Sequence, residues 1–159
     1  DSPSPGPWYY EQQVLGYNYR LTELQAALGL SQLKRLDSIV QERNRLLNVY
    51  KTLLENSTIN FLKIPDNVLS SVHLAVICMP HVSPSDHKRI FEGMRLAQIG
   101  VQLHYSPVHL HPYYREMGWK NGDFPSSELY ASTAFSIPLF PGLTINDQHR
   151  VVSTLLSLL

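Results

Sequence analysis

Residues 16–30, GYNYRLTELQAALGL, decide how the rest of the chain is organised. Thr22 is followed three residues later by Gln25, the spacing of a capping box, in which hydroxyl and amide groups satisfy opposing backbone N–H groups. Apolar residues then recur at helical spacing: Leu21, Leu24, Leu28, Leu33, Leu36, Val40, Leu47, Tyr50 and Leu54. The pattern predicts one helix from Thr22 to about Glu55, which is long for a globular protein.

The residues immediately before this helix combine a glycine, two tyrosines, Asn18 and Arg20. The N-terminus of a helix favours anions, because its first N–H groups lack intrahelical acceptors and the helix dipole is positive there. The residues alone leave two interpretations open. Asn18 and its neighbours bind a phosphate, or the segment is a loop whose aromatic rings pack on the helix.

Composition and charge argue against several classes of partner. The 159 residues include 13 basic and 13 acidic ones without a run of either sign, which gives no support for binding nucleic acid or an anionic membrane. No apolar stretch approaches the ~20 residues that a membrane span needs. The single cysteine, Cys78, cannot form an internal disulfide, and this indicates a reducing, cytoplasmic compartment.

Three strands are predicted after the long helix, at residues 73–79, 101–105 and 135–138, with at most a further short one near 60–64. Ser83 followed by Pro84 predicts the start of a helix that Gly100 ends. A short helix is expected at 126–131, and Thr144 is expected to cap the last one. The fold class is therefore α+β (α/β), a three-stranded sheet covered by helices with one long N-terminal helix. We expect residues 1–21 to form a linker and loop, and 22–159 to form one domain.

Seven histidines raise the question of a metal site. His104, His109 and His111 have the best spacing, but no cysteine or carboxylate accompanies them at a zinc-binding spacing, so no metal is predicted. His104, Tyr105 and His109 instead suggest a neutral, donor-rich rim for sugar hydroxyls or a diphosphate. The alternative is aromatic loop packing with solvated histidines. The remaining four, at positions 73, 81, 87 and 149, are expected at the surface or at strand ends.

Three motifs in sequence order point to a family. They are GYNYRLT with LQAA and QL (16–33), HYSPVH with PYY (104–114), and SIPLFPGLT with DQ (136–148). They resemble the DegT/StrS-type sugar-nucleotide aminotransferases, which are pyridoxal-phosphate enzymes of the aspartate-aminotransferase fold type. WYYE at 8–11, leading into LGYNYR at 15–20, is most similar to aminotransferases of the pseudaminic acid pathway. The resemblance covers residues 8–159 and implies the small C-terminal domain of a fold-type I enzyme.

The resemblance also implies roles for individual residues. Asn18 would reach across a homodimer to the pyridoxal 5'-phosphate group, and Arg20 would add charge there or pair with an acidic neighbour. His104, Tyr105 and His109 would line a pocket for the UDP-linked sugar nucleotide in the neighbouring subunit.

The cofactor requires a lysine amine to anchor it and to move a proton. None of the five lysines, at 34, 51, 63, 88 and 120, stands in the family's lysine motif. No catalytic residue is therefore predicted in this chain, and the large cofactor-binding domain is expected to be absent from it.

Two functions follow. The first is the C-terminal part of an aminotransferase that transfers an amino group from glutamate to a UDP-linked 4-keto-6-deoxy sugar, for bacterial surface polysaccharide or nonulosonic acid biosynthesis. By itself this part would be inactive. The alternative is a non-catalytic, stand-alone module that binds a nucleotide sugar or only dimerises.

Overall fold

The computed structural model describes residues 6–7, 12–17 and 19–159. The chain divides into two compact units, residues 1–35 and residues 36–159, and each is described by itself. The division falls after Arg35, whereas the sequence suggested a boundary after residue 21. Within the first unit, helix α1 (Glu23–Leu33) has no buried residue.

In the first unit, the predicted start of helix α1 is confirmed. The Gln25 backbone N–H donates to Thr22 Oγ1 at 3.3 Å, and the Thr22 backbone N–H donates to Gln25 Oε1 at 3.0 Å. The two bonds form the reciprocal capping box that the sequence predicts. Because both partners lie three residues apart in the chain, no tertiary contact is needed to form it.

The single long helix predicted from Thr22 is wrong. Helix α1 ends at Leu33, and α2 (Leu36–Leu53) begins after a turn in which the Arg35 N–H donates to the Gln32 carbonyl at 3.0 Å. The apolar spacing gives a physical reason. Five residues separate Leu28 from Leu33, and at 100° per residue this rotates the apolar stripe by about 140°. One straight helix would not keep the stripe on one face.

The second unit contains a three-stranded antiparallel sheet in the order β1-β2-β3. The strands are β1 (Asn60–Phe61), β2 (Ala75–Cys78) and β3 (Ala134–Ile137), with Val76 opposite Ser136. β2 and β3 are buried for almost their whole length, and the continuous apolar run at 73–79 predicts this burial for β2. The α+β class and the three-stranded sheet are therefore confirmed.

One of the three strands was assigned to the wrong segment. Residues 101–105 form no strand, and only Gln102 makes an isolated antiparallel bridge, with Ser136. The third strand of the sheet is instead β1. Beyond Gln102 the contact with β3 is made by the His104 side chain, which bonds to the Ser136 hydroxyl, and Pro107 has no N–H group to extend the pairing.

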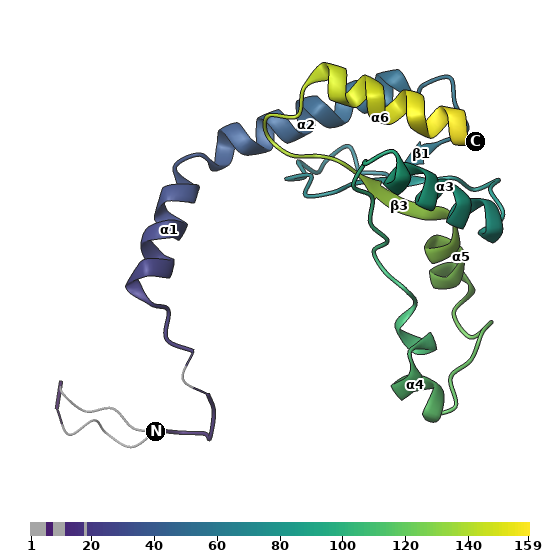
Figure 1. Cartoon of the computed structure of the whole chain (residues 1–159). Coiled ribbons are helices and arrows are strands. Elements are labelled where there is room, and N and C mark those ends of the chain that lie inside the picture. The colour runs from purple at the N-terminus through teal and green to yellow at the C-terminus, as the bar shows by residue number, and fades with distance from the viewer. Residues whose placement is uncertain (1–5, 8–11, 18) are drawn as a thin grey trace. The chain divides into compact units, whose positions relative to one another are not determined.

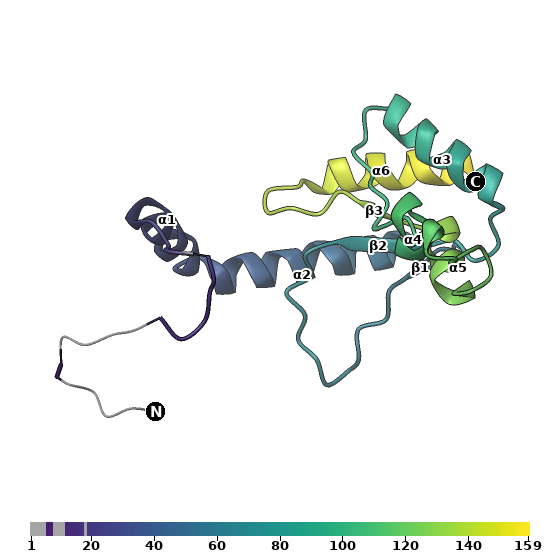
Figure 2. The ribbon, with the colours of Figure 1, turned by 90° about the horizontal axis from the view of Figure 1, so that it is seen from below.

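Helices cover the sheet (Figures 1 and 2). They include α2, α3 (Pro84–Leu96), α5 (Pro125–Thr133) and α6 (Ile145–Leu158). The predicted N-caps Ser83 and Thr144 are confirmed, because each hydroxyl accepts the backbone N–H three residues later. Gly100 does not end α3 as predicted. The left-handed residue after this helix is Gln98, with φ of 58°.

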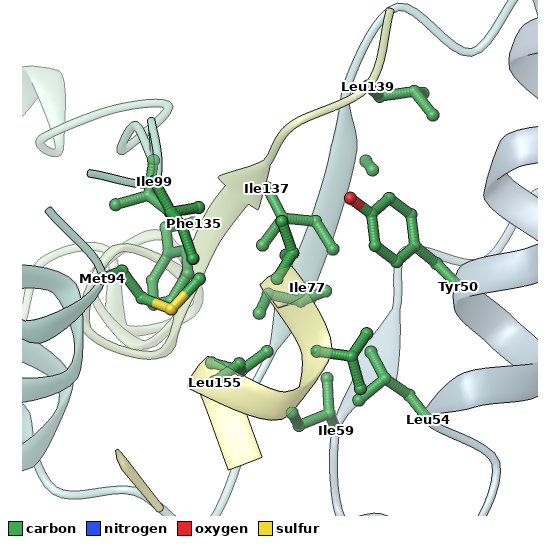
Figure 3. Close-up of a cluster of buried hydrophobic side chains, with 14 of the residues drawn as sticks. Tyr50, Leu54, Ile59, Ile77, Met94, Ile99, Phe135, Ile137, Leu139 and Leu155 are labelled. Carbon is green, nitrogen blue, oxygen red and sulfur yellow. The ribbon is translucent and has the colours of Figure 1, made fainter. Parts of the chain in front are cut away.

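The core joins α2, α3 and α6 to the sheet. Figure 3 shows Tyr50 of α2, Ile77 of β2, Met94 of α3, Phe135 of β3 and Leu155 of α6 in one cluster. All five are at most 1% exposed. Burial raises the pKa of the Tyr50 hydroxyl well above its usual value of 10.0. This core holds β3 in place. Gln102 and His104, which bond to Ser136 of β3, are positioned with it.

His87 departs from the expectation that the four outlying histidines lie at the surface or at strand ends. Its ring is buried on α3 at 5.6 Å from the ring of Phe135, and its Nε2 lies 3.2 Å from the Ala134 carbonyl oxygen. Burial lowers the pKa of this imidazole, because it penalises the charged form. His87 lies three and seven residues before Ile90 and Met94, the other buried residues of α3, so helical spacing places it on the same buried face.

Candidate functional site

The segment before α1 contains the predicted phosphate-binding residues. Asn18 lies outside the described residues, so its predicted role stays a prediction. Arg20 is exposed, two residues before the Thr22 cap. Tyr17 and Tyr19 make an edge-to-face contact at 5.8 Å between ring centroids, and both are 86% exposed. These rings therefore contact each other and leave most of their surface to solvent.

In the second unit, His104 is held by the last strand of the sheet. Its Nε2 lies 2.8 Å from the Ser136 hydroxyl, which in turn donates to the Gln102 carbonyl at 3.3 Å. Ser136 is buried on β3, so its position is fixed by the core. The other ring nitrogen of His104, Nδ1, is buried and has no hydrogen-bond partner among the described residues. Tyr105 packs against the His104 ring at 5.1 Å and is 70% exposed.

His109 is held by a different element. It lies in the 3-10 turn η1 (Val108–Leu110), and its Nε2 is 2.9 Å from Glu128 Oε1 on α5. The ring is 8% exposed and lies 4.8 Å from the Phe124 ring. His109 is thus buried behind Glu128 and Phe124, and does not share the exposed position of Tyr105.

The Glu128 carboxylate collects several donors. The Gly122 N–H donates to both of its oxygens, at 2.9 and 3.1 Å, and the Phe124 N–H reaches Oε1 at 3.4 Å. The hydrogen bond from His109 is the main cause that lowers the pKa of this carboxyl below its usual 4.5, and the Gly122 bond comes next. The carboxylate therefore joins η1, the loop at 118–124 and the start of α5.

A cavity of about 350 Å³ lies next to the His109 ring, which the Glu128 carboxylate holds. It is lined by Val108, His109, Tyr114, Trp119, Phe124 and Ser127. The Trp119 and Phe124 rings lie 5.4 Å apart, so two walls of the cavity contact each other. Aromatic walls of this kind suit the apolar face of a sugar or a planar base.

The structure thus places His104 and Tyr105 together and gives His109 a separate partner. Sequence reasoning missed the two residues that hold the histidines, Ser136 and Glu128. Glu128 is 19 positions from His109, and no local motif links the two. Among the described residues, no group of three or more histidines, cysteines or carboxylates could hold a metal ion, and His111 is exposed.

The fold defines a class: a small α+β domain with a three-stranded antiparallel sheet covered by helices. Residues 6–156 match the family model described as the DegT/DnrJ/EryC1/StrS aminotransferase family. The chain belongs to this family. The resemblance seen in the three motifs is therefore confirmed.

Individual relatives agree with the family. The chain is 35% identical over 158 residues to the UDP-4-amino-4,6-dideoxy-N-acetyl-beta-L-altrosamine transaminase of Campylobacter jejuni, covering 96% of this chain and 40% of that protein. Among solved structures, it is similar to Spr1654 of Streptococcus pneumoniae, classed as a sugar aminotransferase, with a TM-score of 0.88 and 25% identity over 98% of this chain and 39% of the other. It is also similar to PseC of Helicobacter pylori, an aminotransferase of pseudoaminic acid biosynthesis, with a TM-score of 0.85 and 26% identity over 96% of this chain and 41% of PseC.

Three further facts bear on function. The chain spans about two fifths of the length of the relatives it matches. Spr1654 has been solved in forms with pyridoxal phosphate and with pyridoxamine phosphate, so proteins of this fold and family bind that cofactor. Within the part of the chain that the structure describes, no helix is both long and apolar enough to cross a membrane.

Proposed function

We propose that the chain is the C-terminal part of a pyridoxal-phosphate-dependent aminotransferase that transfers an amino group from glutamate to a UDP-linked 4-keto-6-deoxy sugar. The observation that carries the proposal is the match over 96–98% of the chain to a UDP-aminosugar transaminase and to sugar aminotransferases. The similarity to PseC favours the pseudaminic acid pathway. In this proposal the chain is the small domain of a fold-type I enzyme, and the rest of the polypeptide supplies the large domain and the cofactor lysine.

The residues before α1 fit a phosphate group. Arg20 supplies an exposed positive charge, and the Glu23 and Leu24 N–H groups are those that a helix start leaves without intrahelical acceptors. The Glu23 carboxylate lies in the same turn, so the charge of Arg20 is needed to favour an anion. We assign the phosphate to Asn18 and Arg20. When bound, the cofactor supplies an electron sink for the carbon that loses its proton.

We assign the sugar nucleotide to His104 and Tyr105. The Ser136 hydroxyl fixes the imidazole, and the phenol beside it is largely exposed, so one group is oriented and the other is accessible. The Tyr105 hydroxyl can both donate and accept, which suits a diphosphate or a sugar hydroxyl, and the ring contact with His104 orients it. The sequence pattern grouped His109 with His104 and Tyr105. Its Nε2, however, contacts Glu128, so His109 supports residues 104–109 and has no free donor at that atom.

We further propose a homodimer in the cytoplasm. Leu24, Leu28 and Leu33 of α1 are more than 60% exposed, and a run of exposed apolar side chains indicates a surface that a partner covers. Cys78 is a free thiol, which agrees with a reducing compartment.

The proposal is tested with the complete enzyme and with this chain. The complete enzyme, loaded with pyridoxal phosphate, should convert a UDP-linked 4-keto-6-deoxy sugar and glutamate into the amino sugar, followed by mass spectrometry. The 159-residue chain mixed with the cofactor should give no stoichiometric, borohydride-trapped adduct on one lysine. A complete enzyme that binds the cofactor but aminates none of a panel of keto-sugar nucleotides would contradict the assigned reaction.

A further inference from the structure

Residues 104–109 are anchored at both ends by side chains from other elements. At one end, the His104 ring contacts the Ser136 hydroxyl of β3 at 2.8 Å, and at the other the His109 ring contacts the Glu128 carboxylate of α5 at 2.9 Å. Tyr105 lies between the two anchors and is exposed. One anchor rests on strand β3 and the other on helix α5, which directly precedes that strand.

At the second anchor, the Glu128 carboxylate accepts more hydrogen bonds than the one from His109. Besides His109, Glu128 accepts the backbone N–H groups of Gly122 and Phe124. It thereby fastens both ends of an aromatic excursion, defined as residues 108–124, which includes α4 (Pro112–Glu116). In Figure 1, α4 lies at the end of its unit away from α6. These hydrogen bonds to one carboxylate connect both ends of the aromatic excursion to α5.

The same carboxylate supports the wall of the cavity. The His109 ring contacts both the Glu128 carboxylate and the Phe124 ring, and Phe124 contacts Trp119. Removing the Glu128 carboxylate would release the His109 imidazole, the loop at 118–124 and the Phe124 ring that contacts the imidazole. The cavity and residues 104–109 would lose their common support.

We propose that Glu128 is a positioning residue for the sugar-nucleotide site: acting through His109 and the aromatic excursion, it holds Tyr105 and the aromatic cavity in the arrangement that receives the substrate. The inference rests on the proposed function, since it presumes that His104 and Tyr105 contact the sugar nucleotide. Glu128 itself contacts no substrate in this arrangement.

The first test uses the complete enzyme. Glu128→Ala should raise KM for the sugar nucleotide about tenfold, the order expected for losing one charge-assisted contact, with kcat and the KM for glutamate nearly unchanged. Glu128→Gln keeps an acceptor for the backbone N–H groups and should restore most of the loss. His109→Ala should raise KM similarly, and the double variant should be little worse than either single one, because the two act as a unit. Glu116→Ala, an exposed carboxylate of α4, is the matched control.

The second test does not depend on the reaction. In the 159-residue chain with Trp8→Phe, Trp119 is the only tryptophan, so its emission reports the aromatic excursion. Glu128→Ala should shift this emission to longer wavelength, and Glu116→Ala should not. If the wild-type enzyme aminates no keto-sugar nucleotide, the proposed function fails and the emission alone decides whether Glu128 holds the excursion. An active enzyme with unchanged KM in Glu128→Ala, or an unchanged emission, overturns the inference.

Discussion

Replacing Ser136 with alanine removes the hydroxyl group that holds the His104 ring. The hydroxyl lies 2.8 Å from His104 Nε2 and donates to the Gln102 carbonyl at 3.3 Å. The Gln102 carbonyl keeps a second donor, the Ser136 backbone N–H at 2.8 Å, so its loss is small. The main cost falls on His104, whose Nδ1 already has no partner among the described residues.

The magnitude follows from this arrangement. A buried polar group left without a partner costs about 1–3 kcal/mol. The His104 residue as a whole is half-buried, so water can reach part of the ring and the lower half of that range applies, about 1–2 kcal/mol. For a chain of this size, that loss corresponds to a fall in Tm of roughly 2–8 °C.

Urea unfolding followed by circular dichroism measures this loss directly. The matched control is Ser153→Ala, which removes an exposed hydroxyl that bonds only to the Arg150 carbonyl within α6. The control should change the unfolding free energy by less than about 0.5 kcal/mol. Equal midpoints and slopes for both variants would refute the view that Ser136 anchors the imidazole.

Three further outcomes are expected. In the complete enzyme, Asn18→Ala should weaken cofactor retention roughly ten- to a hundredfold without unfolding, as measured by the cofactor dissociation constant, and an unchanged constant would leave Asn18 as a loop residue. The 159-residue chain should sediment as a dimer or larger species, and Leu24→Glu or Leu28→Glu should weaken this association, because these side chains are 82% and 62% exposed. A wild-type monomer at high micromolar concentration would argue against an interface at α1. Burial lowers the pKa of His87, so the unfolded chain binds a proton more readily and the free energy of unfolding should fall as pH drops below about 6.5. His87→Gln should flatten this dependence of stability on pH, and His149→Gln should not. Equal slopes in all three proteins would contradict the assignment.

The sequence by itself determined the local features of this protein. The caps at Thr22, Ser83 and Thr144 were predictable because each connects a side chain to a backbone group three residues away. Strand β2 was predictable from a short continuous apolar run, and the end of β3 was predictable from the proline that follows it. The family was predictable from motifs that are contiguous in the chain.

Only the tertiary structure decided what depends on distant partners. The break between α1 and α2 was missed, because apolar residues keep a helical spacing on either side of the shift between Leu28 and Leu33. His104 and His109 looked equivalent in the sequence, yet Ser136 lies 32 positions from one and Glu128 19 positions from the other. A hydrogen bond across such a separation forms only because the sheet and the packed helices bring the two side chains together, and no period or spacing in the sequence records that approach.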